Sequence, residues 1–268
     1  MTETDIAPLA AGEAVESAFL RAMAQGAADD AELRTLTVGI AAAMAMRSES
    51  PMVNRAIGFS EPVDADLLAP FVGMFREAGT ARAGFKLPRP VLPADWAEVC
   101  ARLGLLPAPQ TLKLTRSAAR PAEPVTTDLR IAPVEADAHE RALKVLLTGF
   151  GDLRPPAEVI DMISTLNRHP RSRQFAAWDG DEIVAVGLVF ADRDAAVLKG
   201  GVTLPSHRGR GAQSALIAAR IEAAREAGCR WVVSETSQPA AGEHHTSLSN
   251  LERAGFVRVY DYVNVLLT

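Results

Sequence analysis

The sequence has few aromatic residues, few cysteines and no excess of basic charge. Aromatic side chains make up 5% of its 268 residues, and the net charge is −5. The two cysteines, Cys100 and Cys229, lie far apart and show no spacing that would hold a metal ion. We therefore expect buried thiols rather than a disulfide framework, no metal site and a reducing, cytoplasmic location.

Long apolar runs are also absent. No run reaches the roughly 18 residues that a membrane-spanning helix needs. The N-terminal stretch MTETDIAPLA carries acids and lacks the basic flank of a secretory signal. A general nucleic-acid binder usually has a basic domain, and the negative net charge argues against one. These absences predict a protein with neither a membrane nor a nucleic acid as its partner.

The residues that are present suffice for two domains. Hydrophobic residues make up 48% and charged residues 23% of the chain, which is enough apolar material for sizeable cores. The small, polar, proline-containing segment Ser117–Thr126 is the best linker in the chain. We predict one domain over residues 1–118, a linker over 119–127 and a second domain over 128–268.

The first half predicts a mixture of helices and short strands. Asp64 or Asp66 is suited to cap a helix that ends at Gly79. Helical and alternating apolar spacing indicate the remaining elements. In order, the expected elements are an alanine-rich helix (3–30), strands (35–46 and 51–59), a helix (64–78), a strand (81–87), a helix (95–103) and a strand (110–116).

The second half has a clearer pattern. The segment Asp179–Gly180–Asp181 between two alternating runs is a strong signal for a β-hairpin. The expected order is a strand (129–134), two helices (137–150 and 155–168), three strands (173–178, 182–190 and 196–204), a long helix, a strand (230–236), a short helix (245–253) and two strands (256–262 and 264–267), which we expect to form a bent pair. The fold class is therefore α/β (α+β), and we expect each of the two domains to have a central mixed, mostly antiparallel sheet flanked by helices.

One stretch, Thr203–Ala227, carries the main functional signal. Pro205 ends an apolar run, the basic turn Arg208–Gly211 follows, and then come about fifteen good helix formers. Such a turn leaves backbone N–H groups unpaired at a helix N-terminus, where the helix dipole favours negative charge. The glycines permit close approach to the backbone, and the arginines add charge. The stretch therefore predicts a phosphate or pyrophosphate site.

This order of elements resembles the GNAT superfamily of acetyl-CoA-dependent N-acyltransferases. The family pattern is Arg or Gln, any two residues, Gly, any one residue, and Gly or Ala. Arg208 and Gly211 match it, whereas Gln213 stands where the family prefers Gly or Ala. The downstream segment Asn250–Phe256 (NLERAGF) is similar to the second landmark of the family and lies about forty residues further on. The resemblance covers roughly residues 128–268.

The resemblance implies how an acetyl-CoA co-substrate would bind. Its pyrophosphate would contact the backbone amides of the turn, and its pantetheine arm would run beside the strand end 201–204. A backbone amide near Val202 or Thr203 would polarise the acyl carbonyl, and Asn250 would contact the pantetheine arm. The implied cofactor-binding residues are Val202, Thr203, Leu204, Arg208, Gly209, Arg210, Gly211, Ala212, Gln213 and Asn250.

The catalytic residues are less well marked. Direct attack of an amine on the thioester needs a base for the ammonium, a donor for the oxyanion and an acid for the leaving thiolate. The usual acid of the family is a tyrosine, and Leu251 stands in its place. The thiolate would leave unassisted or take a proton from water, Tyr260 or Ser249. Glu235 at a strand end is the first candidate for the base, followed by His244 or His245.

The first half resembles a degenerate copy of the second. The segment AEVCARLGLLPAPQTLKLTR mirrors SLSNLERAGFVRVYDYVNVLLT, and SEPVDADL replaces HRGRGAQ. An acidic turn would repel a pyrophosphate, so we expect this copy to be structural and not to bind the cofactor.

The sequence as a whole predicts an N-acetyltransferase with a small-molecule primary amine as acceptor, acting as a monomer or homodimer. The alternatives are a non-catalytic acyl-CoA-binding sensor and a regulatory subunit that works through the N-terminal half.

Overall fold

A computed structural model describes residues 3–27, 32–47, 53–149, 151, 155, 157–239 and 245–268. The chain forms two compact units. Unit 1 comprises Met1–Lys113, Glu235–Ala240 and Arg258–Thr268, and unit 2 comprises Leu114–Ser234 and Ala241–Val257. Within the described residues, no helix combines the length and the apolar character that crossing a bilayer requires.

Three strands contribute residues to both units. They are β6 (Thr111–Ser117), β11 (Trp231–Ser237) and β12 (Val257–Leu267). Unit 1 thus includes the last strand of the chain, which follows the second half in sequence. The linear division into residues 1–118 and 128–268 stays a proposal about two homologous halves, whereas the units describe which residues pack together.

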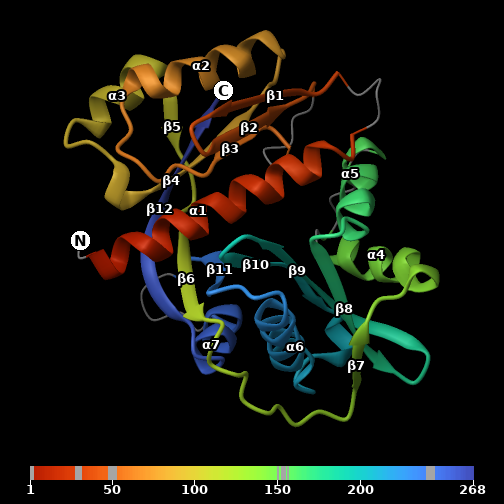
Figure 1. Cartoon of the computed structure of the whole chain (residues 1–268). Coiled ribbons are helices and arrows are strands. Elements are labelled where there is room, and N and C mark those ends of the chain that lie inside the picture. The colour runs from red at the N-terminus through yellow and green to blue at the C-terminus, as the bar shows by residue number, and fades with distance from the viewer. Residues whose placement is uncertain are drawn as a thin grey trace. The chain divides into compact units, whose positions relative to one another are not determined.

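Unit 1 is a mixed sheet covered by helices (Figure 1). The strand order is β1-β2-β3-β4-β12, and β5 also pairs with β12. The β3–β4 pair is parallel, and the β1–β2, β2–β3, β4–β12 and β5–β12 pairs are antiparallel. Its elements are α1 (Glu3–Ala24), β1 (Arg34–Val38), β2 (Ala41–Ala45), β3 (Arg55–Ile57), α2 (Ala65–Glu77), β4 (Ala83–Pro88), η1 (Arg89–Val91), α3 (Trp96–Leu103) and β5 (Leu105–Pro107).

Alternation along β12 separates two buried faces in unit 1. Val263, Val265 and Leu267 join the core beneath α2 and α3, whereas Tyr260 and Tyr262 pack against Leu9 of α1. Successive side chains of a strand point to opposite faces, so α1 covers one face of the sheet and α2 and α3 cover the other.

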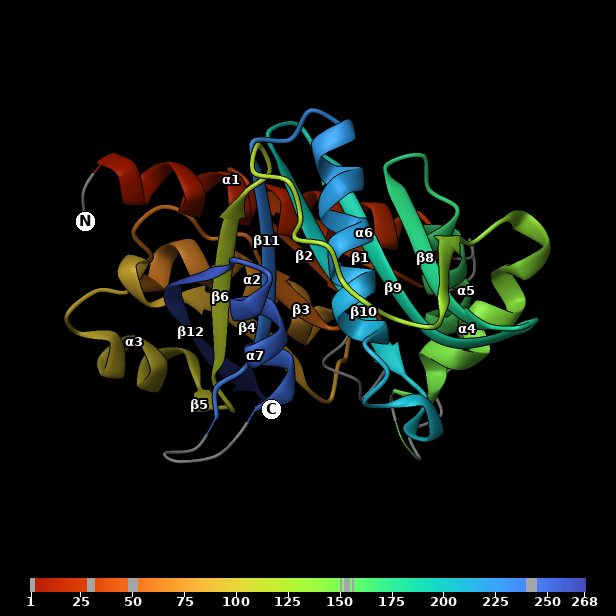
Figure 2. The same cartoon turned by 90° about the horizontal axis from the view of Figure 1, so that it is seen from below.

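The strands of unit 2 follow the order β11-β10-β9-β8-β7, with β6 beside β11 (Figure 2). Helix α6 packs on β8, β9 and β10, while α4 packs on β9 and β10. Most of β9 is buried, as expected for a strand that helices cover on both faces. The elements are β7 (Arg130–Pro133), η2 (Ala136–Ala138), α4 (His139–Thr148), α5 (Ala157–Asn167), β8 (Ser172–Asp179), β9 (Glu182–Asp192), β10 (Ala195–Thr203), η3 (Pro205–His207), α6 (Ala212–Glu226) and α7 (Thr246–Arg253).

Strand β10 changes its pairing along its length. It runs parallel to β11 over Ala195–Val197 and, within the described residues, that pairing covers only three positions. On its other side β10 stays antiparallel to β9, but the register shifts between Lys199 and Val202. Gly200 and Gly201 therefore stand opposite the single residue Gly187, which is a β-bulge. Beyond Val197, no strand of the described residues pairs with β10 on its β11 side, and we call this edge the open side of β10.

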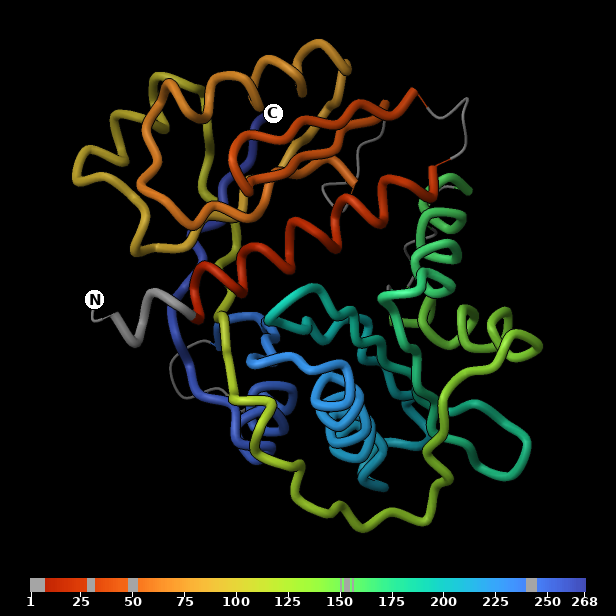
Figure 3. The backbone as a smooth tube through the Cα atoms, in the orientation of Figure 1, coloured from red at the N-terminus to blue at the C-terminus, as the bar shows by residue number. Residues whose placement is uncertain are grey.

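Most of the expected elements are confirmed, including the hairpin at Gly180, where Asp179 pairs with Glu182. Two expectations were wrong. The strand expected over 35–46 is the hairpin β1–β2, because Gly39 adopts a left-handed φ of 59° that a continuous strand does not allow (Figure 3). The two strands expected at the C-terminus are one, because Val263 between them pairs with Leu87. The α/β class with mixed sheets is confirmed.

Candidate functional site

A pocket of about 710 Å³ opens in unit 2 at the end of β10. Its walls come from the strand end, the following turn, the start of α6 and helix α7. Of the predicted contacts, those that line it are Val202, Thr203, Arg208, Gly209, Gly211, Ala212, Gln213 and Asn250. The structure thus brings together residues from both sequence landmarks. Leu204 and Arg210 are the two predicted contacts that do not line the pocket.

Two glycines shape the turn that leads into α6. Gly209 and Gly211 have φ angles of 78° and 80°, in the left-handed region that favours glycine. A Cβ atom on Gly211 would also lie 2.9 Å from the carbonyl oxygen of Thr126. A Cβ on Gly209 would meet nothing within 4 Å, so only its backbone conformation constrains that position.

The N-terminus of α6 has no side-chain cap. Gly211 is the N-cap residue, no side-chain capping hydrogen bond is present among the described residues, and the first turn contains no acid. The helix is 15 residues long, and its dipole places partial positive charge at this end. His207, Arg208 and Arg253 also line the pocket. Uncapped amides together with basic side chains are suited to bind an anion.

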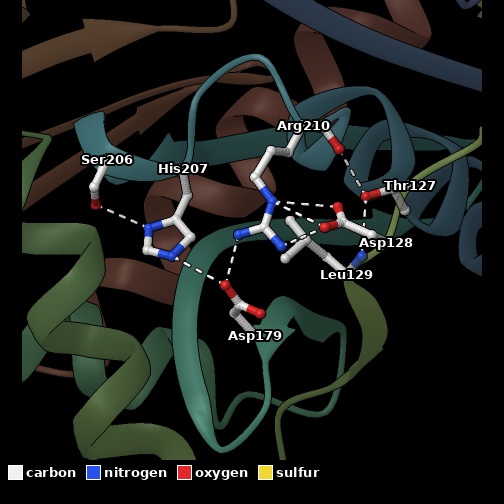
Figure 4. A network of polar contacts seen from close by, with 7 residues as sticks. All are labelled: Thr127, Asp128, Leu129, Asp179, Ser206, His207 and Arg210. Carbon is white, nitrogen blue, oxygen red and sulfur yellow. Dashed lines mark hydrogen bonds and ion pairs between the residues drawn. The ribbon is translucent and has the colours of Figure 1, made fainter.

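The side chain of Arg210 is held away from this role by two carboxylates (Figure 4). Its guanidinium lies 2.5 Å from Asp179 and 2.5 Å from Asp128, and its backbone carbonyl accepts a hydrogen bond from Thr127. Hydrogen bonding to Arg210 lowers the pKa of both carboxyl groups. His207 lies 3.3 Å from Asp179. Arg210 thus ties the turn to two neighbouring segments of unit 2.

Two polar atoms in the pocket wall have no partner among the described residues. They are the hydroxyl oxygen of Thr203 and Oε1 of Gln213, and both atoms are buried. Gln213 lies against Gly201, where a Cβ would be 2.5 Å from Nε2 of Gln213. A buried polar atom without a partner costs free energy, so both are suited to hydrogen bond with a ligand in the pocket.

Helix α7 forms the opposite wall of the pocket. Arg253 donates a hydrogen bond to Oδ1 of Asn250, so the amide oxygen of this predicted contact is already used within the helix. Thr246 and Ser247 line the pocket as well, and sequence reasoning missed them together with Arg253, His207, Gly149 and Ser214. The available signal for the first three was the second landmark, because Thr246 and Ser247 begin the helix that continues into NLERAGF and Arg253 lies within that motif.

The predicted catalytic residues Glu235 and Tyr260 belong to unit 1, and neither lines the pocket. Glu235 forms an ion pair with Lys86 at 2.5 Å. The Tyr260 hydroxyl donates to Glu13 at 2.6 Å, and burial raises the Tyr260 pKa well above its ordinary value. A raised pKa makes a hydroxyl a weaker acid. The catalytic roles of both residues stay predictions.

The other candidates for proton transfer lie around α7. His245 caps the helix, and its Nδ1 accepts a hydrogen bond from the backbone N–H of Leu248. Ser249 lies within α7, and His244 is outside the described residues.

Burial raises the pKa of Cys229, which makes it a poor nucleophile. Among the described residues, no cluster of three or more acidic, histidine or cysteine side chains is arranged to hold a metal ion.

Residues 140–246 match the acetyltransferase (GNAT) family. The match includes the end of β10, the basic turn, α6 and β11, and it ends at the first residue of α7. No curated protein matches the chain in sequence.

Solved GNAT structures resemble the chain over most of its length. One is a GCN5-related N-acetyltransferase from Kribbella flavida, with 19% identity, a TM-score of 0.67 and coverage of 96% of this chain and 94% of that one. Another is a GCN5-related N-acetyltransferase from Sphaerobacter thermophilus, with 14% identity, a TM-score of 0.60 and coverage of 75% and 66%. A third is a tandem GNAT protein from the clavulanic acid biosynthesis pathway, with 14% identity, a TM-score of 0.55 and coverage of 96% and 94%. At these identities the similarity shows a shared fold.

Proposed function

We propose that this protein transfers an acetyl group from acetyl-CoA to a primary amine of a small molecule. The observation that carries the proposal is the uncapped N-terminus of α6, which faces a basic pocket beside the open side of β10. Both features lie within residues 140–246, which match the acetyltransferase family. An extended ligand with a pyrophosphate at one end fits this combination of a strand edge and an anion site.

Each part of the pocket has a role in holding the acyl donor. The amides of residues 209–213 and the side chain of Arg208 would bind the pyrophosphate. The open side of β10 at Gly201–Thr203 would pair with the pantetheine arm, and the unpartnered atoms of Thr203 and Gln213 would take its amide groups. A backbone amide near Val202 would polarise the thioester carbonyl.

The reaction is a direct displacement. The nitrogen of the neutral amine forms a bond to the carbonyl carbon, the carbon–sulfur bond breaks, and its electron pair leaves with the sulfur as a thiolate. The proton that the amine loses passes to a base, for which Glu235 and His245 are the candidates. Tyr260 stays a proposal for the acid that protonates the thiolate. We propose that the protein acts as a monomer or a homodimer on this small-molecule acceptor.

Calorimetry with acetyl-CoA on two matched variants tests the donor site. In G209D a carboxylate enters the pocket beside the proposed pyrophosphate, whereas G209N has the same shape without the charge. Both side chains tolerate a left-handed φ better than most and would meet no neighbour at this position. We expect G209D to bind at least about tenfold more weakly than G209N. Equal affinities, or no binding by the wild type, would contradict the donor site.

A second candidate function is a non-catalytic acyl-CoA sensor. It is favoured by Leu251, a buried side chain of α7 at the position where the family has the tyrosine that acts as the general acid. A panel of amines separates the two, because the transferase releases free thiol from acetyl-CoA and the sensor does not. Binding of acetyl-CoA without turnover on a broad panel would place the sensor first.

A further inference from the structure

Arg220 is a charged side chain buried in the interior of unit 2. It lies in the middle of α6 and is 2% exposed. Its guanidinium donates to the carbonyl oxygen of Leu216 in its own helix at 2.9 Å. Longer contacts of 3.5 and 3.4 Å reach the carbonyl oxygens of Leu188 and Lys199. All three partners are backbone carbonyls, so no hydrogen bond of Arg220 neutralises its charge.

No carboxylate forms an ion pair with Arg220 among the residues that the structure describes. Burial alone lowers its pKa, to about 10, and no neighbouring charge contributes to that shift. The side chain therefore remains protonated at neutral pH. Holding an unpaired charge in a protein interior costs free energy, which a purely structural site would avoid with an apolar residue.

The guanidinium lies at the β-bulge that shapes the pocket. Leu188 and Lys199 are the last regular pair of β9 and β10 before the bulge. Gly187 stands opposite the bulge, and a Cβ there would lie 2.7 Å from the guanidinium carbon of Arg220. Gly201, on the bulged strand, lines the pocket. The charge thus lies behind the strand segment at which we propose that the acyl donor binds.

We propose that Arg220 is an electrostatic positioning residue that supplies an uncompensated positive charge to the acyl-donor pocket and stabilises the thiolate that leaves as the carbon–sulfur bond breaks. This inference rests on the proposed function, because it needs a CoA thiol in the pocket. A charge in a low-dielectric interior acts over a longer distance than one at the surface. Stabilising the thiolate in this way reduces the need for the acid that Leu251 has replaced.

The test is the thiol pKa of bound CoA, measured from the ultraviolet absorbance of the thiolate as pH is varied, with no acceptor present. In the wild type we expect a pKa below that of free CoA. In R220M and R220Q we expect it to rise by about one unit, because both lack the charge. R220Q retains a side-chain donor, so a rise in both variants assigns the effect to charge.

The outcomes separate the inference from the proposed function. Calorimetry that shows no CoA binding by the wild type contradicts the function. If the wild type binds CoA but the thiol of bound CoA has the same pKa as that of free CoA, the inference is overturned and the proposed function stands. An unchanged pKa in R220M or R220Q also overturns the inference, because the helix dipole would then account for the lowering. If R220M does not fold, the wild type and R220Q still give the decisive comparison.

Discussion

The two units contain a strand–helix–strand segment with parallel strands, and the two helices begin differently. Helix α2 lies between β3 and β4, and Asp64 caps it by accepting a hydrogen bond from the backbone N–H of Leu67 at 2.7 Å. Helix α6 lies between β10 and β11, and it starts at Gly211 without any side-chain cap. Helix α2 therefore has a side-chain partner for one of its first amides, whereas α6 has no such cap, and we propose that its amides bind a ligand.

Buried charges follow the same contrast. In unit 1, Glu16 and Lys113 form an ion pair at 2.5 Å with side chains only 3% and 1% exposed, and Glu13 accepts hydrogen bonds from Tyr260 and Tyr262. In unit 2, Arg220 contacts backbone carbonyls alone. Glu16, Lys113 and Glu13 of unit 1 thus have side-chain partners, whereas Arg220 of unit 2 has no acidic partner among the described residues.

The largest effect is expected from breaking the buried ion pair. K113M leaves the Glu16 carboxylate buried without this partner, so we expect a loss of about 3–5 kcal/mol in the free energy of unfolding, measured with urea. The double variant E16Q/K113M removes the buried charge and should recover much of the loss. The contrast between the units would be contradicted if K113M lowered the free energy of unfolding by no more than R220M does. R220M removes a charge that has no acidic partner among the described residues.

A smaller effect is expected at the cap of α2. D64A removes the hydrogen bond to Leu67, and we expect a loss of about 1 kcal/mol in the free energy of unfolding. D66A is the matched control, because Asp66 carries the same charge in the first turn and forms only an exposed ion pair with Arg102. We expect D66A to lower the free energy of unfolding by less than D64A does. Equal losses would show that the charge near the helix end, rather than the cap, stabilises α2.

The smallest effect is expected from Glu13 and concerns the pH dependence of stability. Burial raises the Glu13 pKa above its ordinary value of 4.5, so the folded state favours the protonated carboxyl. The stability that this preference gives the folded state is complete below the Glu13 pKa of the unfolded state. It is lost as pH rises through the raised Glu13 pKa of the folded state. The oxygen of E13Q can accept from the same tyrosines but does not titrate. When urea unfolding is measured between about pH 5 and pH 8, the free energy of unfolding should therefore decline less with pH for E13Q than for the wild type. The same pH dependence in both proteins would contradict a raised Glu13 pKa.

Local chemistry determined the part of the site that could be predicted from the sequence. The basic turn, helix α6 and the hairpin at Gly180 depend on residues that are close in sequence, so turn glycines and helix formers suffice to indicate them. The departure at Gln213 was also visible, although its position against Gly201 was not. The anion site at the start of α6 was thus open to prediction.

Tertiary structure decided the rest, because it depends on residues that are far apart in the chain. The partners of Lys113 and Tyr260 lie 97 and 247 residues away, and no local pattern connects them. The pairing of β12 with β4 likewise places the end of the chain in unit 1. The sequence by itself determined the glycine turn and the start of α6, where we propose that an anion binds. Only packing decided that Arg220 would be buried without a counter-charge, because burial and pairing are properties of the neighbours that the fold assembles.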